Sequence, residues 1–173
     1  MVIQIASNDS SQNDSEDDVK IERSLRSEGI VFPLRQEEDI ERLERMVRED
    51  PFLRQQYIDH ISKKVCGQQN IVSDIQKIFT NKSLENYTYD GVYNSKYPRK
   101  AMKHYDIFTD CLLTAWMDDV TADELKKALI KTTQKAKQNL SSARYYQRYR
   151  NRLLEQRKVS WRLKAKARKN QSE

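Results

Sequence analysis

The sequence of 173 residues is poor in the residues that make tight turns and covalent cross-links, with three glycines, three prolines and two cysteines. So few glycines and prolines exclude a β-sandwich or barrel, which needs many tight turns. Two cysteines cannot form a disulfide framework, which favours a reducing compartment. No apolar run approaches the roughly 20 residues that cross a bilayer, so we expect no membrane span. We also expect no secretory signal, because the apolar start Met1–Ala6 is too short.

Motifs for catalysis and metal binding are also missing. The sequence contains no glycine-rich phosphate loop, no G-x-S-x-G and no H-E-x-x-H. His60 and Cys66, like His104 and Cys111, are spaced too widely for the close ligand pairs of a zinc site. We therefore expect a protein that is not an enzyme and that holds no metal ion and no cofactor.

Charge is abundant and unevenly distributed. Charged residues make up 34% of the chain, hydrophobic residues 37%, and the mean hydropathy is -0.94. Residues 121–173 contain 16 Lys/Arg and four Asp/Glu, a net charge of +12, and the remaining 16 basic and 22 acidic residues give residues 1–120 a net charge of −6. Residues 1–19 contain five acidic residues and no basic residue. This polar composition predicts that residues 1–20 are disordered.

The spacing of apolar residues predicts an all-α fold. We expect a disordered acidic tail and lead-in over residues 1–31, a small four-helix domain over 32–118, and a long basic helix or tail over 119–173. The four short helices are predicted at residues 36–49, 51–65, 71–79 and about 99–118. Their predicted caps are Asp50 and Asn70 at N-termini and Gly67 at a C-terminus.

The predicted long helix opens at Thr121-Ala-Asp-Glu124, which is a capping-box sequence. Apolar residues then recur at spacings of three, four or seven from Leu125 to Leu153. No proline interrupts the pattern to the end of the sequence, so a single helix is expected.

Four tyrosines surround the turn pair Asp90-Gly91 and predict a loop or a small hairpin over residues 85–99. Two interpretations stay open for these residues. They form a recognition loop, or they cover the rim of a small core. The four residues are Tyr87, Tyr89, Tyr93 and Tyr97.

The C-terminal segment mixes cations with aromatic residues. Residues 144–169 contain eleven Lys/Arg, and Glu155 is the single acid among them. Interleaved tyrosines and Trp161 suit phosphate contacts combined with stacking, particularly on single strands or RNA. Contact with about six phosphates would give a log–log salt slope near −5. The predicted nucleic-acid contacts are Arg148, Arg152, Arg157, Lys158, Arg162 and Lys166.

Other interpretations of this segment remain open. It has the composition of a nuclear-import signal, with Arg162, Lys164, Lys166, Arg168 and Lys169. It could also be a solvated or partner-binding tail, whereas its thin apolar face argues against a membrane partner. The leading hypothesis is a small nuclear protein that binds DNA, RNA or chromatin and contacts other proteins. The alternative is a protein-interaction adaptor that forms homo-oligomers through the helix Leu125–Leu153, its basic tail serving only for nuclear import.

The middle of the chain carries a series of short motifs. Phe32-Pro-Leu34 is followed by Glu37-Glu-Asp39 and Leu43-Glu44, and later by Ile75–Thr80, Leu84, Tyr87, Gly91 and the apolar stretch Ile107–Trp116. This pattern, over about residues 32–117, resembles the domain of unknown function 4806 (DUF4806), a family common in insect proteins that has no established activity. The helix ending in Phe-Thr is also similar, more distantly, to the BEN-type DNA-binding domain. These likenesses imply chromatin or DNA contact, or association with a mobile element.

Overall fold

The computed structural model of the protein describes residues 25, 28–64 and 70–170, and of Lys64 and residues 163–170 only the backbone. The acidic residues 1–20, predicted to be disordered, and the predicted C-cap Gly67 lie outside the described residues. The chain divides into two compact units, Met1–Ala136 and Lys137–Glu173.

The first described helix, α2, spans Glu37–Glu49 and confirms the helix predicted at residues 36–49. It begins with a capping box, in which the Asp39 carboxylate accepts a hydrogen bond from the backbone N–H of Gln36 at 3.0 Å. Ile40, Leu43 and Val47 follow at steps of three or four, and all three are buried. The apolar spacing of the sequence therefore marks the face that α2 turns to the core.

The next two helices begin at the predicted caps. Helix α3 spans Pro51–Lys64, and Asp50 Oδ1 accepts a hydrogen bond from the N–H of Phe52 at 2.8 Å. Helix α4 spans Ile71–Ile78, and Asn70 Oδ1 accepts from the N–H of Ser73 at 3.2 Å. Each cap satisfies a backbone donor that the helix itself leaves without a partner.

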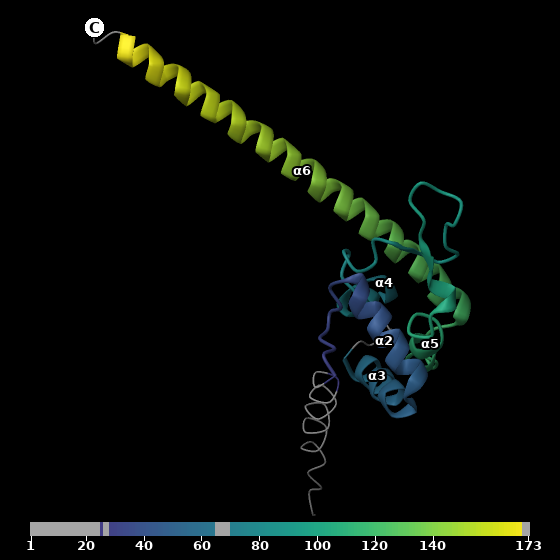
Figure 1. Ribbon diagram of the computed structural model, residues 1–173. Helices are drawn as coiled ribbons and strands as arrows, with labels where there is room; N and C mark the ends of the chain where they lie inside the picture. Colours follow the sequence, from purple (N-terminus) through teal and green to yellow (C-terminus); the bar gives the residue numbers. More distant parts are fainter. Residues whose placement is uncertain (1–24, 26–27, 65–69, 171–173) are drawn as a thin grey trace, which may run out of the picture. The chain divides into compact units, whose positions relative to one another are not determined.

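The core of the first unit lies among these helices (Figure 1). Helix α2 packs against α3, and α3 packs against α5, which spans Asp110–Ala115. The lead-in joins the core through Leu34, which forms a parallel bridge with Phe79. The Phe79 ring lies 4.8 Å from that of Phe108, measured between centroids. The core also reaches beyond residues 32–118, because Leu25 and Ile30 on one side and Leu125 and Leu129 on the other are buried.

The helix predicted at about residues 99–118 is wrong for most of its length. Residues Lys100–Ala101 form a short strand, β2, which pairs in parallel with β1, Tyr87–Thr88. A 3₁₀ turn, η1, follows at Met102–His104, and α5 begins only at Asp110.

The reason for this difference is a tertiary contact. The carboxylate of Glu44 on α2 accepts hydrogen bonds from the backbone N–H groups of Asp106 and Ile107, at 3.0 and 3.1 Å. Those donors are therefore not available to a helix that runs through residues 102–107. Phe108 and Cys111 are fully buried. The regular spacing of apolar residues over 99–118 therefore reflects burial in several short turns, not one continuous helix.

The last helix, α6, spans Ala122–Asn170 and confirms the predicted long C-terminal helix. Its capping box is formed: Glu124 Oε2 accepts from the N–H of Thr121 at 2.9 Å, and Thr121 Oγ1 accepts from the N–H of Glu124 at 3.3 Å. Leu125, Leu129 and Ala136 are buried in the core of the first unit. The fold class is therefore all-α, as predicted, and the two-residue strands β1 and β2 are the only strand pair in the part of the chain that the structure describes. Among the described residues, no helix combines the length and the apolar character of a bilayer-spanning segment.

Candidate functional site

The cationic part of α6 is exposed to solvent. Every side chain from Ser141 to Arg162 is exposed. Four of the predicted phosphate contacts carry no ion pair among the described residues: Arg148, Arg152, Arg157 and Arg162. We call residues 144–162 the cationic segment.

Helix geometry sorts these cations onto two faces. An α-helix turns by about 100° per residue, so Arg148, Arg152, Lys158 and Arg162 fall within an arc of about 120°. Arg157 lies on the opposite side, about 180° from Arg148. We call the first set the cationic face. The structure thus brings together four of the six predicted contacts and separates Arg157 from them.

The sixth predicted contact, Lys166, and the import-signal residues Lys164, Arg168 and Lys169 lie on the helical backbone of α6. Their side chains lie outside the described residues. Lys166 is four residues beyond Arg162, and this spacing continues the cationic face by one further turn.

One acidic residue lies within the cationic face. Glu155 Oε1 accepts a hydrogen bond from Lys158 Nζ at 2.8 Å. That hydrogen bond, the charge of Lys158 and the more distant charge of Arg162 lower the pKa of Glu155. Glu155 therefore stays ionised at neutral pH and offsets the charge of Lys158.

The opposite face of the same segment carries exposed aromatic and aliphatic side chains. Tyr146, Tyr149 and Leu153 are 68%, 52% and 39% exposed and follow one another at steps of three and four. Tyr145 touches the edge of Tyr146, with ring centroids 5.8 Å apart and planes at 75°. Cations on one face and rings on the other are the two groups that a single-stranded polyanion contacts.

A second cluster of charged and polar side chains lies in the first unit, and it was not predicted from the sequence. The carboxylate oxygen Oε1 of Glu41 accepts hydrogen bonds from Tyr87 Oη at 2.6 Å, Tyr105 Oη at 2.7 Å and Lys100 Nζ at 2.7 Å. Lys100 also contacts Glu37 Oε1 at 2.7 Å. We call these five residues the Glu41 cluster. It ties β1, β2 and the following turn to α2.

The electrostatics of the Glu41 cluster favour a structural role, in which the cluster holds these elements together, over a role in proton transfer. Partial burial acts to raise the pKa of Glu41, but hydrogen bonds from Lys100, Tyr87 and Tyr105 outweigh it and lower the pKa. Burial, together with the Glu41 carboxylate, raises the pKa of Tyr105 to about 12. Since a general base works best with a pKa near the operating pH, a carboxylate held below its ordinary value is poorly placed for that role.

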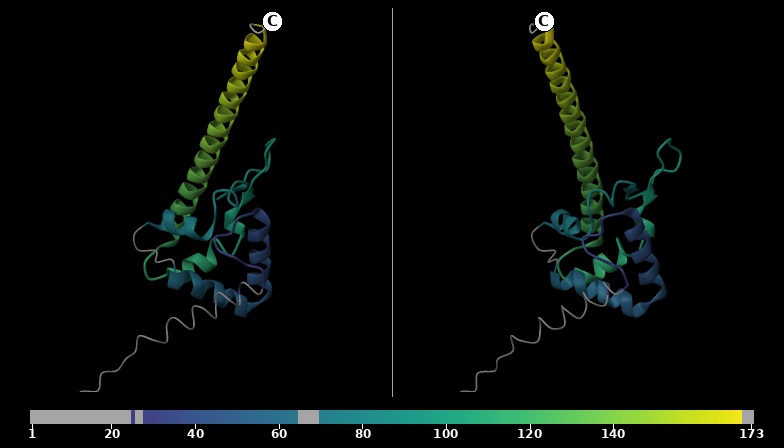
Figure 2. Two further views of the ribbon diagram at one scale, coloured as in Figure 1. Left: turned by 90° about the vertical axis from the view of Figure 1, so that its left-hand side faces the viewer. Right: turned by 60° about the vertical axis from the view of Figure 1, so that its left-hand side comes forward.

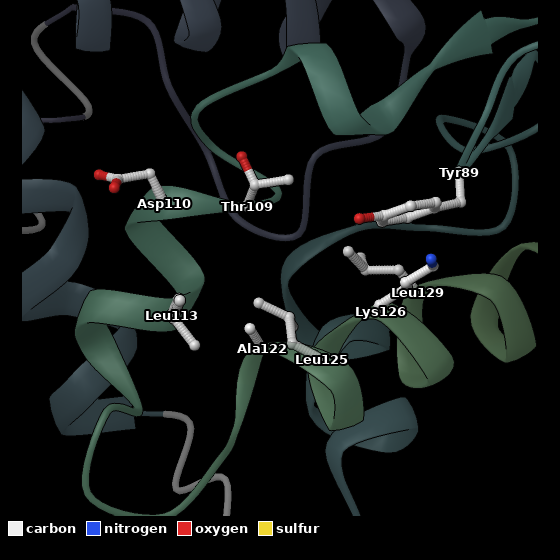
Figure 3. Close-up of a pocket in the computed structure, with 8 residues that line it drawn as sticks. All are labelled: Tyr89, Thr109, Asp110, Leu113, Ala122, Leu125, Lys126 and Leu129. Atoms are coloured by element: carbon white, nitrogen blue, oxygen red, sulfur yellow. The ribbon is translucent and has the colours of Figure 1, made fainter.

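A small pocket of about 250 Å³ lies between α5, the start of α6 and Tyr89 (Figure 3). Its apolar side chains come from both helices and include Leu113, Leu125 and Leu129. Lys126 lies over the Tyr89 ring, with Nζ 5.3 Å from the centroid. Asp110 turns its carboxylate away from the pocket and pairs with Arg54 of α3. This volume is below the range of about 300–1,000 Å³ for small-molecule sites.

No cluster of three or more His, Cys, Asp or Glu side chains that could hold a metal ion lies within the described residues. Cys111 is fully buried on α5. Burial raises the pKa of its thiol to about 11, so it is predominantly protonated at neutral pH.

A comparison with known families identifies the central part of the chain. A family model described as Domain of unknown function (DUF4806) matches residues 26–115, which is more than half of the chain. No curated protein and no solved structure matches the sequence. The match confirms the resemblance of residues 32–117 to this family, whereas the likeness to the BEN-type domain finds no support. The chain is a member of the DUF4806 family.

Proposed function

We propose that this protein binds nucleic acid through the cationic segment of α6 and has no catalytic role. The observation that carries the proposal is the cationic face itself. Arg148, Arg152 and Arg162 project from one side of a helix, exposed and without an ion pair among the described residues. Such a face matches the regular negative charge of a phosphate backbone, which supplies most of the affinity in sequence-independent binding.

The helix dimensions set the scale of the contact. Arg148 and Arg162 are 14 residues apart, or about 21 Å along the axis at 1.5 Å per residue. This length equals about six phosphate steps of one DNA strand. A duplex meets one face of the helix, where Glu155 offsets the charge of Lys158, so about three phosphates are neutralised and the log–log salt slope is about −2.7. A single strand that wraps around the helix also reaches Arg157 on the other side.

Charge-neutral variants of the full chain test the proposal. Arg148→Gln combined with Arg152→Gln removes two cations of the cationic face. The matched control, Arg150→Gln with Arg157→Gln, removes two cations from the opposite side of the same segment. For duplex DNA, the first variant should lower affinity by about tenfold or more and make the salt slope shallower by about two. The control should change duplex binding much less.

Glu155→Gln provides a test in the other direction. It removes the one acid of the cationic face and releases Lys158 from its ion pair. Affinity for duplex DNA should rise, and the salt slope should steepen by up to about one. Unchanged binding in both the Arg148/Arg152 and the Glu155 variants, measured by fluorescence anisotropy at several salt concentrations, would refute the role of this face.

Nuclear localisation forms part of the proposal and is supported by the basic composition of residues 162–169. A fluorescent fusion of the full chain should accumulate in the nucleus. Replacing Lys164, Arg168 and Lys169 with Gln should leave it distributed through the whole cell. None of these three residues is a predicted phosphate contact, and the variant that tests duplex binding changes Arg148 and Arg152, so import and binding can be tested separately.

A second candidate function rests on the exposed stripe of Tyr146, Tyr149 and Leu153. Apolar residues at steps of three and four are typical of helices that associate with a partner helix. In that case the protein is an adaptor that self-associates through α6. Sedimentation of the full chain would then show a dimer that Tyr149→Ser with Leu153→Ser converts to a monomer.

A further inference from the structure

The four tyrosines between residues 87 and 97 divide into two pairs with different surroundings. Tyr87 is fully buried and Tyr89 packs against the core, so this pair fits the interpretation of tyrosines at a core rim. Tyr93 and Tyr97 are 67% and 69% exposed. They lie on a loop that extends away from the helices of the first unit (Figure 2).

The base of this loop is fixed by the backbone. Val92 and Arg99 form an antiparallel bridge in which each N–H donates to the other residue's carbonyl oxygen, at 2.9 and 2.8 Å. Gly91 precedes the bridge with φ 79°, a left-handed conformation that glycine adopts without strain. The two exposed rings are therefore presented on a closed loop rather than on a free chain end.

A hollow of about 500 Å³ lies beside the loop, within the range of about 300–1,000 Å³ for small-molecule sites. Its cations outnumber its single carboxylate by three to one. The residues that line it are Glu37, Asn86, Tyr93, Lys96, Tyr97, Pro98, Arg99 and Lys100.

The charges of the hollow are not all compensated. Glu37 accepts hydrogen bonds from Lys100 Nζ at 2.7 Å and from Asn86 Nδ2 at 2.6 Å, so its carboxylate is already satisfied. Lys96 Nζ lies 5.8 Å from the centroid of the Tyr97 ring and makes no ion pair with a described residue. Arg99 Nη1 is buried and has no hydrogen-bond partner. Rotation of this guanidinium toward an anion would therefore break no hydrogen bond at Nη1.

We propose that this hollow binds one unpaired nucleotide of a single strand, with its base against the rings of Tyr93 and Tyr97 and its phosphate on Lys96 and Arg99. Exposed rings next to cations suit such a ligand, because every base offers a face for stacking and every linkage carries a charge. In a duplex the base faces are covered by their neighbours and cannot stack on a side chain. The loop thus adds a preference for single strands to the proposed function, on which this inference rests.

The test compares full-length variants on two labelled ligands, oligouridine and a DNA duplex of the same length. Tyr93→Ala with Tyr97→Ala removes both rings, and Tyr93→Phe with Tyr97→Phe is the matched control that keeps them. The alanine variant should lower affinity for oligouridine by about tenfold or more, the scale of one or two lost stacks. Duplex affinity should stay within about twofold, and the phenylalanine variant should bind both ligands as the unaltered chain does.

The outcomes separate the two proposals. If oligouridine binds the alanine variant as tightly as the unaltered chain while Arg148→Gln with Arg152→Gln weakens binding, the loop proposal fails and the proposed function stands. If the unaltered chain binds neither ligand, both fail. Tighter binding of free uridine monophosphate than of oligouridine would overturn the strand as the ligand. Ultraviolet cross-linking of oligouridine to Tyr93 or Tyr97, located by mass spectrometry, would support the site directly.

Discussion

Replacement of Glu44 by alanine should be among the most damaging single changes to the first unit. Glu44 is 6% exposed, and its carboxylate serves the backbone N–H groups of Asp106 and Ile107 from a helix some 60 residues earlier in the chain. It also contacts Arg48 Nε at 2.6 Å. Alanine removes all three contacts and brings no new partner.

The magnitude follows from these contacts. Two buried or partly buried donors without acceptors cost about 1–3 kcal/mol each, and the half-exposed Arg48 ion pair adds less than about 1 kcal/mol. The free energy of unfolding should therefore fall by about 2–7 kcal/mol, against a total of about 5–15 kcal/mol for a typical domain. Glu44→Gln keeps one acceptor oxygen and should lose about half as much.

Urea denaturation followed by the fluorescence of Trp116 measures this change. Trp116 is 3% exposed, so its emission reports the core, whereas Trp161 is 75% exposed and is replaced by Phe in every variant. Glu49→Ala is the control, because Glu49 is an exposed carboxylate on the same helix. This variant should change stability by less than about 0.5 kcal/mol. A loss below about 1 kcal/mol in Glu44→Ala would refute the reasoning. If that variant does not fold, Glu44→Gln still provides the measurement.

Three further predictions follow from the first unit. The pKa of Glu41 is lower in the folded state than its ordinary 4.5. The contribution of Glu41 to stability is therefore present above pH 4.5 and is lost as the pH falls through the folded pKa. Glu41→Gln should flatten the acid side of a stability–pH curve, and an unchanged curve would argue against the Glu41 cluster. Gly91→Ala places a Cβ at φ +79°, 2.9 Å from the Tyr93 hydroxyl, and should lower the thermal unfolding midpoint at a cost of about 1–2 kcal/mol. In a Cys66→Ser background, the buried Cys111 thiol, with a pKa of about 11, should react with a thiol reagent at pH 8 only as fast as the protein opens; rapid labelling of the folded chain would contradict its placement.

The starts of α3, α4 and α6 could be predicted because the capping interactions that set them join residues close together in the sequence. Asp50 and Asn70 cap α3 and α4 through donors two or three residues away, and Thr121 and Glu124 cap α6 across three residues. The cationic face also follows from the sequence, because on a continuous helix the position of a residue in the sequence determines the side on which its side chain lies. The separation of Arg157 from the other cations also depends only on its sequence position and the helical turn of about 100° per residue.

The Glu41 cluster could not be predicted in this way. Its members come from α2, β1, β2 and the turn that contains Tyr105, with up to 64 residues between Glu41 and its partner. No spacing rule relates residues that far apart.

The tyrosine loop was an intermediate case. The sequence offered a recognition loop and a core rim as alternatives, and only burial showed that Tyr87 and Tyr89 lie at the core while Tyr93 and Tyr97 are exposed.

The sequence by itself determined the all-α class, the caps, the long basic helix and the family-like motifs, because each depends on residues within a few positions of one another. The tertiary structure alone decided where the apolar stretch after residue 99 becomes helix. The Glu44 carboxylate accepts hydrogen bonds from the backbone N–H groups of Asp106 and Ile107. That contact requires α2 to pack against the segment that precedes α5. A local pattern cannot contain such a contact, since the acceptor and its donors meet only when the core has formed.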